Sequence, residues 1–350
     1  ESWYRRIGPP ERRIVDLVSL CPGIPLQVLL ETADAQAAET LEEQGVLEVS
    51  HGDGSVRLRN PLYARLVAER VPLGHFFELW QELLGARLNP AFWADGPAKA
   101  FAVWSATAGN AVDPALAARA CAAANRDGEP DTVLKIAAAV QALGPHPRLM
   151  LERARALRTL HQAAAAEEEL KNLIGMNHPE TEVPALLELA QTARSLSRPH
   201  MSAAQALRQA EAASAALPEP GRTELLQQAT AVRASLAVLD ADTGAAPAAL
   251  GALCLDAGAP ADVVLQARAC RCQLLALGGR TQEAQQEAAE LWDSLQQARD
   301  LPLTAGAEIR DGIVCTHIMC ADPARALALL DQARRLPSLE THLGAWPELP

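Results

Sequence analysis

Several short motifs that carry catalysis are missing from this chain of 350 residues. It has no Gly-x-x-x-x-Gly-Lys-Ser/Thr, so the loop that cradles the phosphates of a nucleotide is absent. It also lacks Gly-x-Ser-x-Gly, His-Glu-x-x-His and Gly-x-Gly-x-x-Gly, and its eight histidines stand apart. We therefore expect no enzyme activity, no metal and no cofactor bound by this chain alone.

The chain also lacks long apolar runs and a cysteine framework. No eighteen consecutive residues are apolar and uncharged, and no basic-then-apolar leader occurs, so we expect neither a membrane span nor secretion. The seven cysteines are irregularly spaced, which favours reduced thiols and a cytoplasmic protein. Cys270 and Cys272 lie two apart on a predicted helix and so face different sides. Buried thiols are favoured there over zinc ligands.

Within residues 41 to 72 the spacing of hydrophobic residues changes three times. Gly45 ends an Ala/Glu-rich helix, residues 46–49 and 55–59 alternate as two short strands, and Pro61 can begin a new helix. The turn between the strands is Gly-Asp-Gly at 52–54, which predicts a hairpin. Further helices are predicted over 14–20, 26–30 and 35–44. Together these elements predict a winged-helix domain over residues 1–72.

Winged helices usually read DNA, but the charge of this one argues against that role. The helix that would enter the groove carries Asp34, Glu39, Glu42 and Glu43 and no lysine or arginine. Residues 1–72 hold 8 Lys+Arg against 11 Asp+Glu, where a duplex-binding domain needs a basic stripe. A solvated acidic face is the favoured interpretation.

The string Val-Arg-Leu-Arg-Asn-Pro-Leu-Tyr at 56–63, followed by Val67 and Pro72, resembles a known family. It is similar to the end of the winged helix in large STAND-class, MalT-like transcriptional regulators of the LuxR family. The resemblance is good over about residues 10–72. The remainder of the chain shares only the general character of the family. It implies a parent protein with a nucleotide-binding module for ATP or ADP upstream, a helical-repeat sensor region, and a C-terminal helix-turn-helix.

That resemblance also implies partners. The winged helix would contact the parent's own nucleotide-binding domain, and DNA would be bound only through a C-terminal domain absent here. The chain starts at Glu1 and stops at Pro350 soon after a repeat, so we expect the middle piece of a longer protein. Relatives commonly carry a histidine where this chain has Asn60. Asn60 is either a nucleotide-module contact or, as we favour, the N-cap of the next helix.

Residues 73–110 form a predicted aromatic-rich helical junction. They hold seven of the twelve aromatic residues of the chain, namely Phe76, Phe77, Trp80, Phe92, Trp93, Phe101 and Trp104. Aromatic side chains bury large areas, so core packing is favoured over an aromatic ligand pocket.

Residues 111–350 are predicted to form TPR-like helical repeats, so the fold class is a mainly α protein with an α-solenoid of antiparallel helix pairs. First helices of the pairs are predicted to start near residues 148, 183, 221, 261 and 304, and second helices near 163, 201, 244, 280 and 322. Ala284 and Ala326 place small side chains where paired helices approach. Residues 111–145 would add one or two helices of the same kind.

Arginines gather on the predicted first helices, which line the concave face of TPR-like arrays. Such a groove would bind an anionic effector or an acidic peptide, because arginine pairs with carboxylate and phosphate. The alternative is that these arginines are solvated or paired along their own helices. The candidate groove residues are Arg153, Arg194, Arg233, Arg268, Arg271 and Arg310.

Two classes of function remain open. One is a regulatory sensor region of a transcriptional regulator, which binds an effector or partner and couples to a nucleotide module outside this chain. The other is a free-standing TPR-like scaffold for protein–protein interaction.

Overall fold

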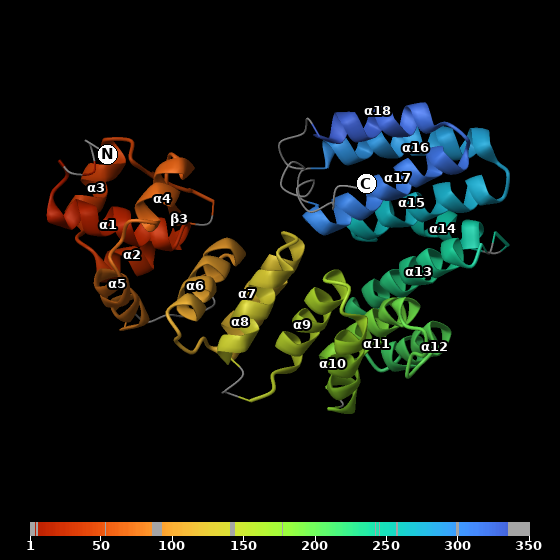
Figure 1. Ribbon diagram of the computed structural model, residues 1–350, viewed down its shortest axis with the longest axis horizontal. Coiled ribbons are helices and arrows are strands. Elements are labelled where there is room, and N and C mark those ends of the chain that lie inside the picture. Colours follow the sequence, from red (N-terminus) through yellow and green to blue (C-terminus); the bar gives the residue numbers. More distant parts are fainter. Residues whose placement is uncertain are drawn as a thin grey trace. The chain divides into compact units, whose positions relative to one another are not determined.

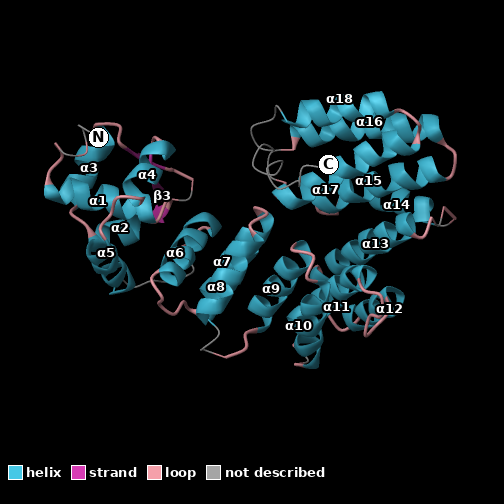
Figure 2. Ribbon diagram, in the orientation of Figure 1, coloured by secondary structure: helices cyan, strands magenta, loops and turns pink. Residues whose placement is uncertain are grey.

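The computed structural model describes most of the chain as helix (Figures 1 and 2). The described residues are 4, 6–52, 54–85, 93–140, 144–176, 178–241, 243–244, 246–256, 258–298 and 301–334. The predicted turn residue Asp53 and the predicted aromatic Phe92 lie outside them. The mainly helical content agrees with the expected fold class and is consistent with an α-solenoid.

The chain divides into two compact units. The first contains residues 1–124 and 131–153, and the second contains residues 125–130 and 154–350. The finer division predicted from the sequence, at residues 72 and 110, remains a prediction.

The N-terminal part of the first unit combines four helices with a small sheet. Its elements are α1 (Pro9–Leu20), β1 (Ile24–Pro25), α2 (Leu26–Thr32), α3 (Ala35–Glu43), β2 (Leu47–Val49), β3 (Ser55–Leu58) and α4 (Pro61–Ala68). The strands form one antiparallel sheet in the order β1-β3-β2, with Leu47 opposite Leu58. The hairpin and the surrounding helices therefore form where the hydrophobic pattern predicts them, while β1 was not predicted.

Local chemistry explains these boundaries. Gly45 after α3 and Gly54 before β3 adopt positive φ angles of 69° and 64°, which glycine reaches without a steric penalty. The carboxylate of Asp34 caps α3 by accepting hydrogen bonds from the backbone N–H groups of Gln36 and Ala37. Glu39 and its acidic neighbours on α3 are exposed, in agreement with a solvated acidic face.

Helix α4 differs from an ordinary amphipathic helix. Its apolar residues Leu62 and Leu66 stand one turn apart, but their side chains are 70% and 51% exposed, and Tyr63 beside them is 56% exposed. No residue of α4 is fully buried among the residues described. The helical period was read correctly, but this face does not enter the core of the first unit.

Helices α5 (Leu73–Gly85) and α6 (Asp95–Thr107) hold five aromatic residues of the predicted junction, and Trp93 lies just before α6. Trp80, Trp93, Phe101 and Trp104 are buried, and the Trp80 indole N–H donates to Ser105 Oγ at 2.8 Å. Phe101 and Trp104 meet edge to face with ring centroids 6.3 Å apart. These contacts are those of a packed core. Two further helices, α7 (Pro114–Arg126) and α8 (Pro130–Val140), fall where residues 111–145 were expected to add them.

The second unit consists of successive helix pairs. Helix α9 (Pro147–Thr159) leads into it from the first unit, and the later helices are α10 (Ala163–Gly175), α11 (Pro179–Thr192) with the short η3 (Ala193–Ser195), α12 (Ala203–Ser214), α13 (Gly221–Leu239), α14 (Ala246–Cys254), α15 (Ala261–Leu277), α16 (Thr281–Gln297), α17 (Leu303–Met319) and α18 (Pro323–Arg334). Every predicted start lies within about four residues of the observed one.

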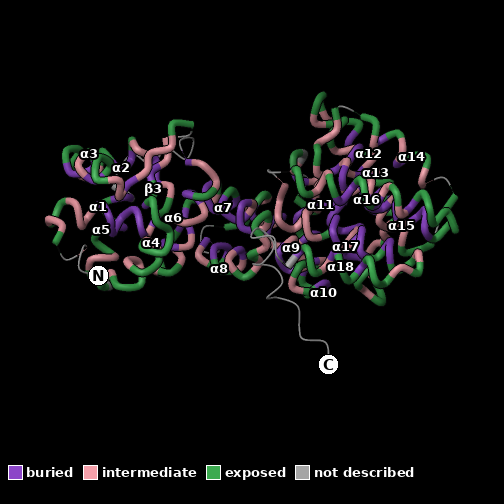
Figure 3. Tube along the Cα trace, turned by 90° about the horizontal axis from the view of Figure 1, so that it is seen from above, coloured by how far each residue is buried: buried purple, intermediate pink, exposed green. Residues whose placement is uncertain are grey.

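The first helices of the pairs also contact one another. Helix α11 packs on α13, α13 on α15, and α15 on α17, while α12, α14, α16 and α18 each pack against their own neighbours in sequence. Figure 1 shows α15 to α18 lying side by side in this way, and buried positions recur along these helices in Figure 3. Ala284 and Ala326 are 0% and 3% exposed, as expected for close helix contacts. Within the described residues no helix is both long and apolar enough to cross a bilayer.

Candidate binding groove

The first helices of the second unit border a groove of about 440 Å³. Its described lining comes from α9, the turn after it, α11 with η3, α13, α15 and α17, and from no second helix of a pair. The lining is mixed: charged and amide side chains face small apolar ones. A concave surface of this size suits a small ligand or a short segment of peptide.

One end of the groove is built on a three-residue ion cluster. Glu188 of α11 receives Arg155 Nε at Oε1 and Arg158 Nε at Oε2, both at 3.0 Å. Burial alone would raise the pKa of Glu188, but the charges of Arg158 and Arg155 lower it below its usual value. Because Arg158 also lines the groove, this cluster fixes one of its walls.

Two further charged residues line the groove, one on η3 and one on α17. Arg194 lies on η3, and burial together with the nearby charge of Arg158 lowers its pKa. Glu308 lies on α17, where burial and the carboxylates of Glu188 and Asp311 raise its pKa against the charge of Arg158. Solvent reaches both side chains, although protein surrounds much of each. Besides Arg158, the groove therefore presents a guanidinium with a lowered pKa and a carboxylate with a raised pKa.

Amide and thiol groups complete the polar surface. Gln266 Nε2 donates to Glu308 Oε2 at 3.0 Å, and Gln273 Nε2 donates to the carbonyl of Gly312 at 3.3 Å. Cys270 is buried at the groove wall, and burial raises the pKa of its thiol to about 11. Cys272, two residues further along α15, is 0% exposed. Both cysteines are thus buried thiols, as favoured, and Cys270 is a poor nucleophile at neutral pH.

The predicted arginine groove requires correction, because only Arg194 of the six candidates belongs to the described lining. Arg233 turns away and pairs with Glu211 of α12. Arg268 lies near Glu287 and donates to Ser294 Oγ at 3.2 Å, and Arg271 pairs with Glu287. Each of these arginines lies near an acid of an adjacent second helix, Arg233 near one on the preceding α12 and Arg268 and Arg271 near one on the following α16.

The remaining two candidates also stand outside the groove lining. Arg310 is 2% exposed, and its guanidinium donates to Asp311 Oδ1 at 3.1 Å. A side chain so buried cannot receive a ligand from solvent. Arg153 is half-buried on α9 within the first unit, so it is not part of the groove as the second unit forms it.

Sequence reasoning missed Glu308 and did not select Arg158. Arg158 was visible as one of several arginines on a first helix, but its side of the helix could not be chosen without the packing. Glu308 gave no sequence signal, since it is one acid among 43 Asp+Glu residues. What singles it out is its position in the same groove as Arg194, which only the fold provides.

Asn60 occupies the position predicted for a helix cap. Its side-chain oxygen accepts a hydrogen bond from the backbone N–H of Leu62 at 3.0 Å, at the start of α4. This confirms the favoured role. The side chain is exposed, and contact with a nucleotide module stays a prediction.

Comparisons with known proteins give no family for the chain: no model of a known protein family matches it, and no curated protein matches it significantly.

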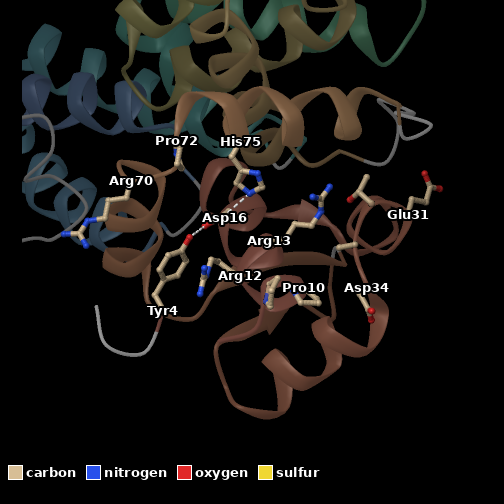
Figure 4. Close-up of a pocket in the computed structure, with 13 residues that line it drawn as sticks. Tyr4, Pro10, Arg12, Arg13, Asp16, Glu31, Asp34, Arg70, Pro72 and His75 are labelled. Atoms are coloured by element: carbon tan, nitrogen blue, oxygen red, sulfur yellow. Dashed lines mark hydrogen bonds and ion pairs between the residues drawn. The ribbon is translucent and has the colours of Figure 1, made fainter. Parts of the chain in front are cut away.

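A second cavity, of about 980 Å³, lies in the first unit and is lined by the N-terminal segment, α1, α2 and the start of α5 (Figure 4). At its wall Tyr4 Oη donates to Asp16 Oδ1 at 2.5 Å, and His75 Nε2 lies 3.4 Å from Asp16 Oδ2. Burial raises the pKa of Asp16, and Arg12 stacks 5.4 Å above the Tyr4 ring. These residues satisfy one another and tie three segments together, which is a structural role.

Proposed function

We propose that this chain is the sensor region of a STAND-class, LuxR-type transcriptional regulator, and that the groove on its helical repeats binds an effector. The observation that carries the proposal is that, among the described residues, the groove is lined by first helices of the pairs and the short segments directly after them, and by no second helix. Successive TPR-like pairs generate such a concave surface, and repeat proteins use it for binding.

The N-terminal elements support the coupling half of the proposal. Helix, strand, two helices and a hairpin follow in the order that a winged helix requires. The exposed acids on α3 disfavour contact with DNA phosphates. Exposed Leu62, Tyr63 and Leu66 on α4 agree with a helix that contacts another domain. In the proposal this element passes the effector-bound state to a nucleotide module outside the chain.

A ligand screen that includes a variant with a blocked groove tests whether the groove binds an effector. Thermal unfolding is measured with sugars, nucleotides, amino acids and anionic metabolites, because a ligand that prefers the folded state raises its melting temperature. Gln266→Trp places a large side chain in the groove, whereas Gln286→Trp makes the same change at an exposed position on α16. We expect at least one compound to stabilise the wild type and Gln286→Trp but not Gln266→Trp.

The proposal fails if the screen gives no stabilising compound, or if stabilisation survives in Gln266→Trp. Sequencing the parent gene tests the coupling half separately. A phosphate-binding loop upstream and a helix-turn-helix downstream are expected, and a parent gene without either would leave a free-standing repeat scaffold.

A further inference from the structure

Arg194 is available to a ligand. Its guanidinium lines the groove from η3, and within the described residues it makes no hydrogen bond or ion pair of its own. Arg158 next to it is committed to Glu188 at 3.0 Å. Arg194 therefore contributes the cationic charge in the groove that protein carboxylates have not already paired.

Glu308 lines the same groove from α17. Its carboxylate accepts a hydrogen bond from the neutral amide of Gln266 and, among the described residues, has no cation within ion-pair distance. Arg194 and Glu308 also form no ion pair with each other, although each feels the other's charge. The groove thus holds two opposite charges that face the same space and remain apart.

We propose that this groove binds a small zwitterion, with the ligand's carboxylate on Arg194 and its ammonium group on Glu308. This inference rests on the proposed function, since it assigns a ligand class to the same groove. An α-amino acid, an ω-amino acid or a short peptide has the required pair of charges. A ligand carrying both charges would make a charge-assisted hydrogen bond at each end, and each such bond is stronger than a neutral one.

The remainder of the lining supports this class over others. The described lining contains no Phe, Tyr or Trp, the large rings on which a sugar or a nucleobase would stack best, and His161 is its one imidazole. A simple polyanion would meet Glu308 as a like charge. Gln191 and Ser195 offer neutral hydrogen-bonding groups, and Val232 and Val238 offer a small apolar wall for an aliphatic stem. A volume of about 440 Å³ holds an amino acid or a short peptide.

Calorimetric titration of the whole chain tests the assignment. The probes are leucine and diglycine, together with a series of glycine, β-alanine and γ-aminobutyrate. Along this series the distance between the ammonium group and the carboxylate increases. Butyrate and butylamine serve as the singly charged halves of the ligand. We expect at least one zwitterion to bind at least about tenfold more tightly than both halves, since one charge-assisted bond accounts for a factor of this size.

Two neutralising variants test the two ends separately. Arg194→Gln and Glu308→Gln should each weaken the best zwitterion by at least about tenfold. Both side chains reach solvent, so we expect each variant to fold, which circular dichroism checks. Arg233→Gln is the matched control, because Arg233 pairs with Glu211 on α12 outside the groove. It should bind as the wild type does.

Several outcomes would overturn the inference. They are no binding by any zwitterion at about 10 mM, equal binding by a singly charged half, or unchanged binding in either groove variant. If a neutral or singly charged compound binds instead and Gln266→Trp abolishes its binding, the zwitterion assignment fails while the sensor proposal stands. If Gln266→Trp leaves all binding intact, the groove itself is not the site and both fail.

Discussion

At the scale of single residues, Glu188 stabilises one wall of the groove. Its carboxylate accepts hydrogen bonds from two arginine side chains of the preceding first helix. Glu188→Gln removes the charge that both Arg155 and Arg158 face. Losing one partner of a buried pair costs several kcal/mol, and the partial exposure of these arginines reduces this to about 2 kcal/mol. Urea unfolding followed by circular dichroism measures the loss.

A surface ion pair in the same unit is the control for this change. Glu283 pairs with Arg280 at a fully exposed site on α16. Glu283→Gln should leave the unfolding midpoint unchanged. An equal loss in both variants would show that Glu188 has no special role.

The contribution of Glu188 to the free energy of unfolding should also depend on pH. The folded-state pKa of Glu188 lies below its usual value of 4.5, so the unfolded chain binds the proton more readily. Its stabilisation is therefore fully present above that value and is lost as pH falls through the folded-state pKa. The difference in unfolding free energy between wild type and Glu188→Gln should be constant from about pH 6 to 8 and shrink below about pH 4.

Asn60 makes a local contribution to stability at the start of α4. Asn60→Ala removes the acceptor for the Leu62 N–H and should cost about 1 kcal/mol in denaturant unfolding. Asn60→Asp keeps an acceptor of the same geometry, as Asp34 shows at the start of α3, and should preserve stability. A loss as large in the aspartate variant would mean that the cap is not what Asn60 supplies.

At the scale of elements, α15 and α17 approach closely at Gly312. A β-carbon there would lie 3.0 Å from Ala269 Cβ, which sits directly on the backbone of α15 and cannot move aside easily. Gly312→Ala should therefore destabilise the protein by about 1 kcal/mol despite alanine's better helix propensity.

Gly306 on the same helix is the matched control. A β-carbon there meets nothing within 4 Å, so Gly306→Ala should be neutral or stabilise by up to about 1 kcal/mol. Thermal unfolding should show a lower melting temperature for Gly312→Ala and an unchanged or higher one for Gly306→Ala. A gain in stability for Gly312→Ala would contradict the close approach.

Element boundaries were the part of the fold that could be predicted from sequence. The starts of α13 and α15 each follow a proline, Pro220 and Pro260, which is a local signal that a short stretch of sequence carries. β1 could not be predicted, because two residues carry no periodicity and the strand exists only by pairing with Val56 and Ser55 far along the chain. The unburied face of α4 was missed for a related reason: periodicity shows that a face exists and not what covers it.

The groove was predictable only in part, for the same physical reason. The sequence places arginines on first helices, and the fold does put first helices around the groove. Whether Arg233 or Arg268 turns inward depends on helix rotation and on acids of adjacent helices, such as Glu211 on the preceding α12 and Glu287 on the following α16. Tertiary packing sets the rotation of each helix and the distance from each arginine to its acid. The spacing of residues along the sequence does not contain this information.

For the second unit as a whole, stability should be graded along the array. In a repeat protein each helix pair is stabilised mainly by its neighbours. Helix α15 packs against α13, α14, α16 and α17, whereas α18 packs principally on α17 within the described residues. Hydrogen exchange should therefore be slowest in α15 and much faster in α18. Uniform protection across both helices would instead indicate one indivisible cooperative unit.

Gly312 has a further consequence, for how this protein can change over generations. The residue lies both at the groove and at the α15–α17 contact, so any larger side chain would disturb helix packing and groove shape together. A lineage could escape only by a simultaneous change at Ala269, and alanine can shrink only to glycine. Homologous sequences should therefore retain glycine at 312 or pair its replacement with glycine at 269, while position 306 drifts freely.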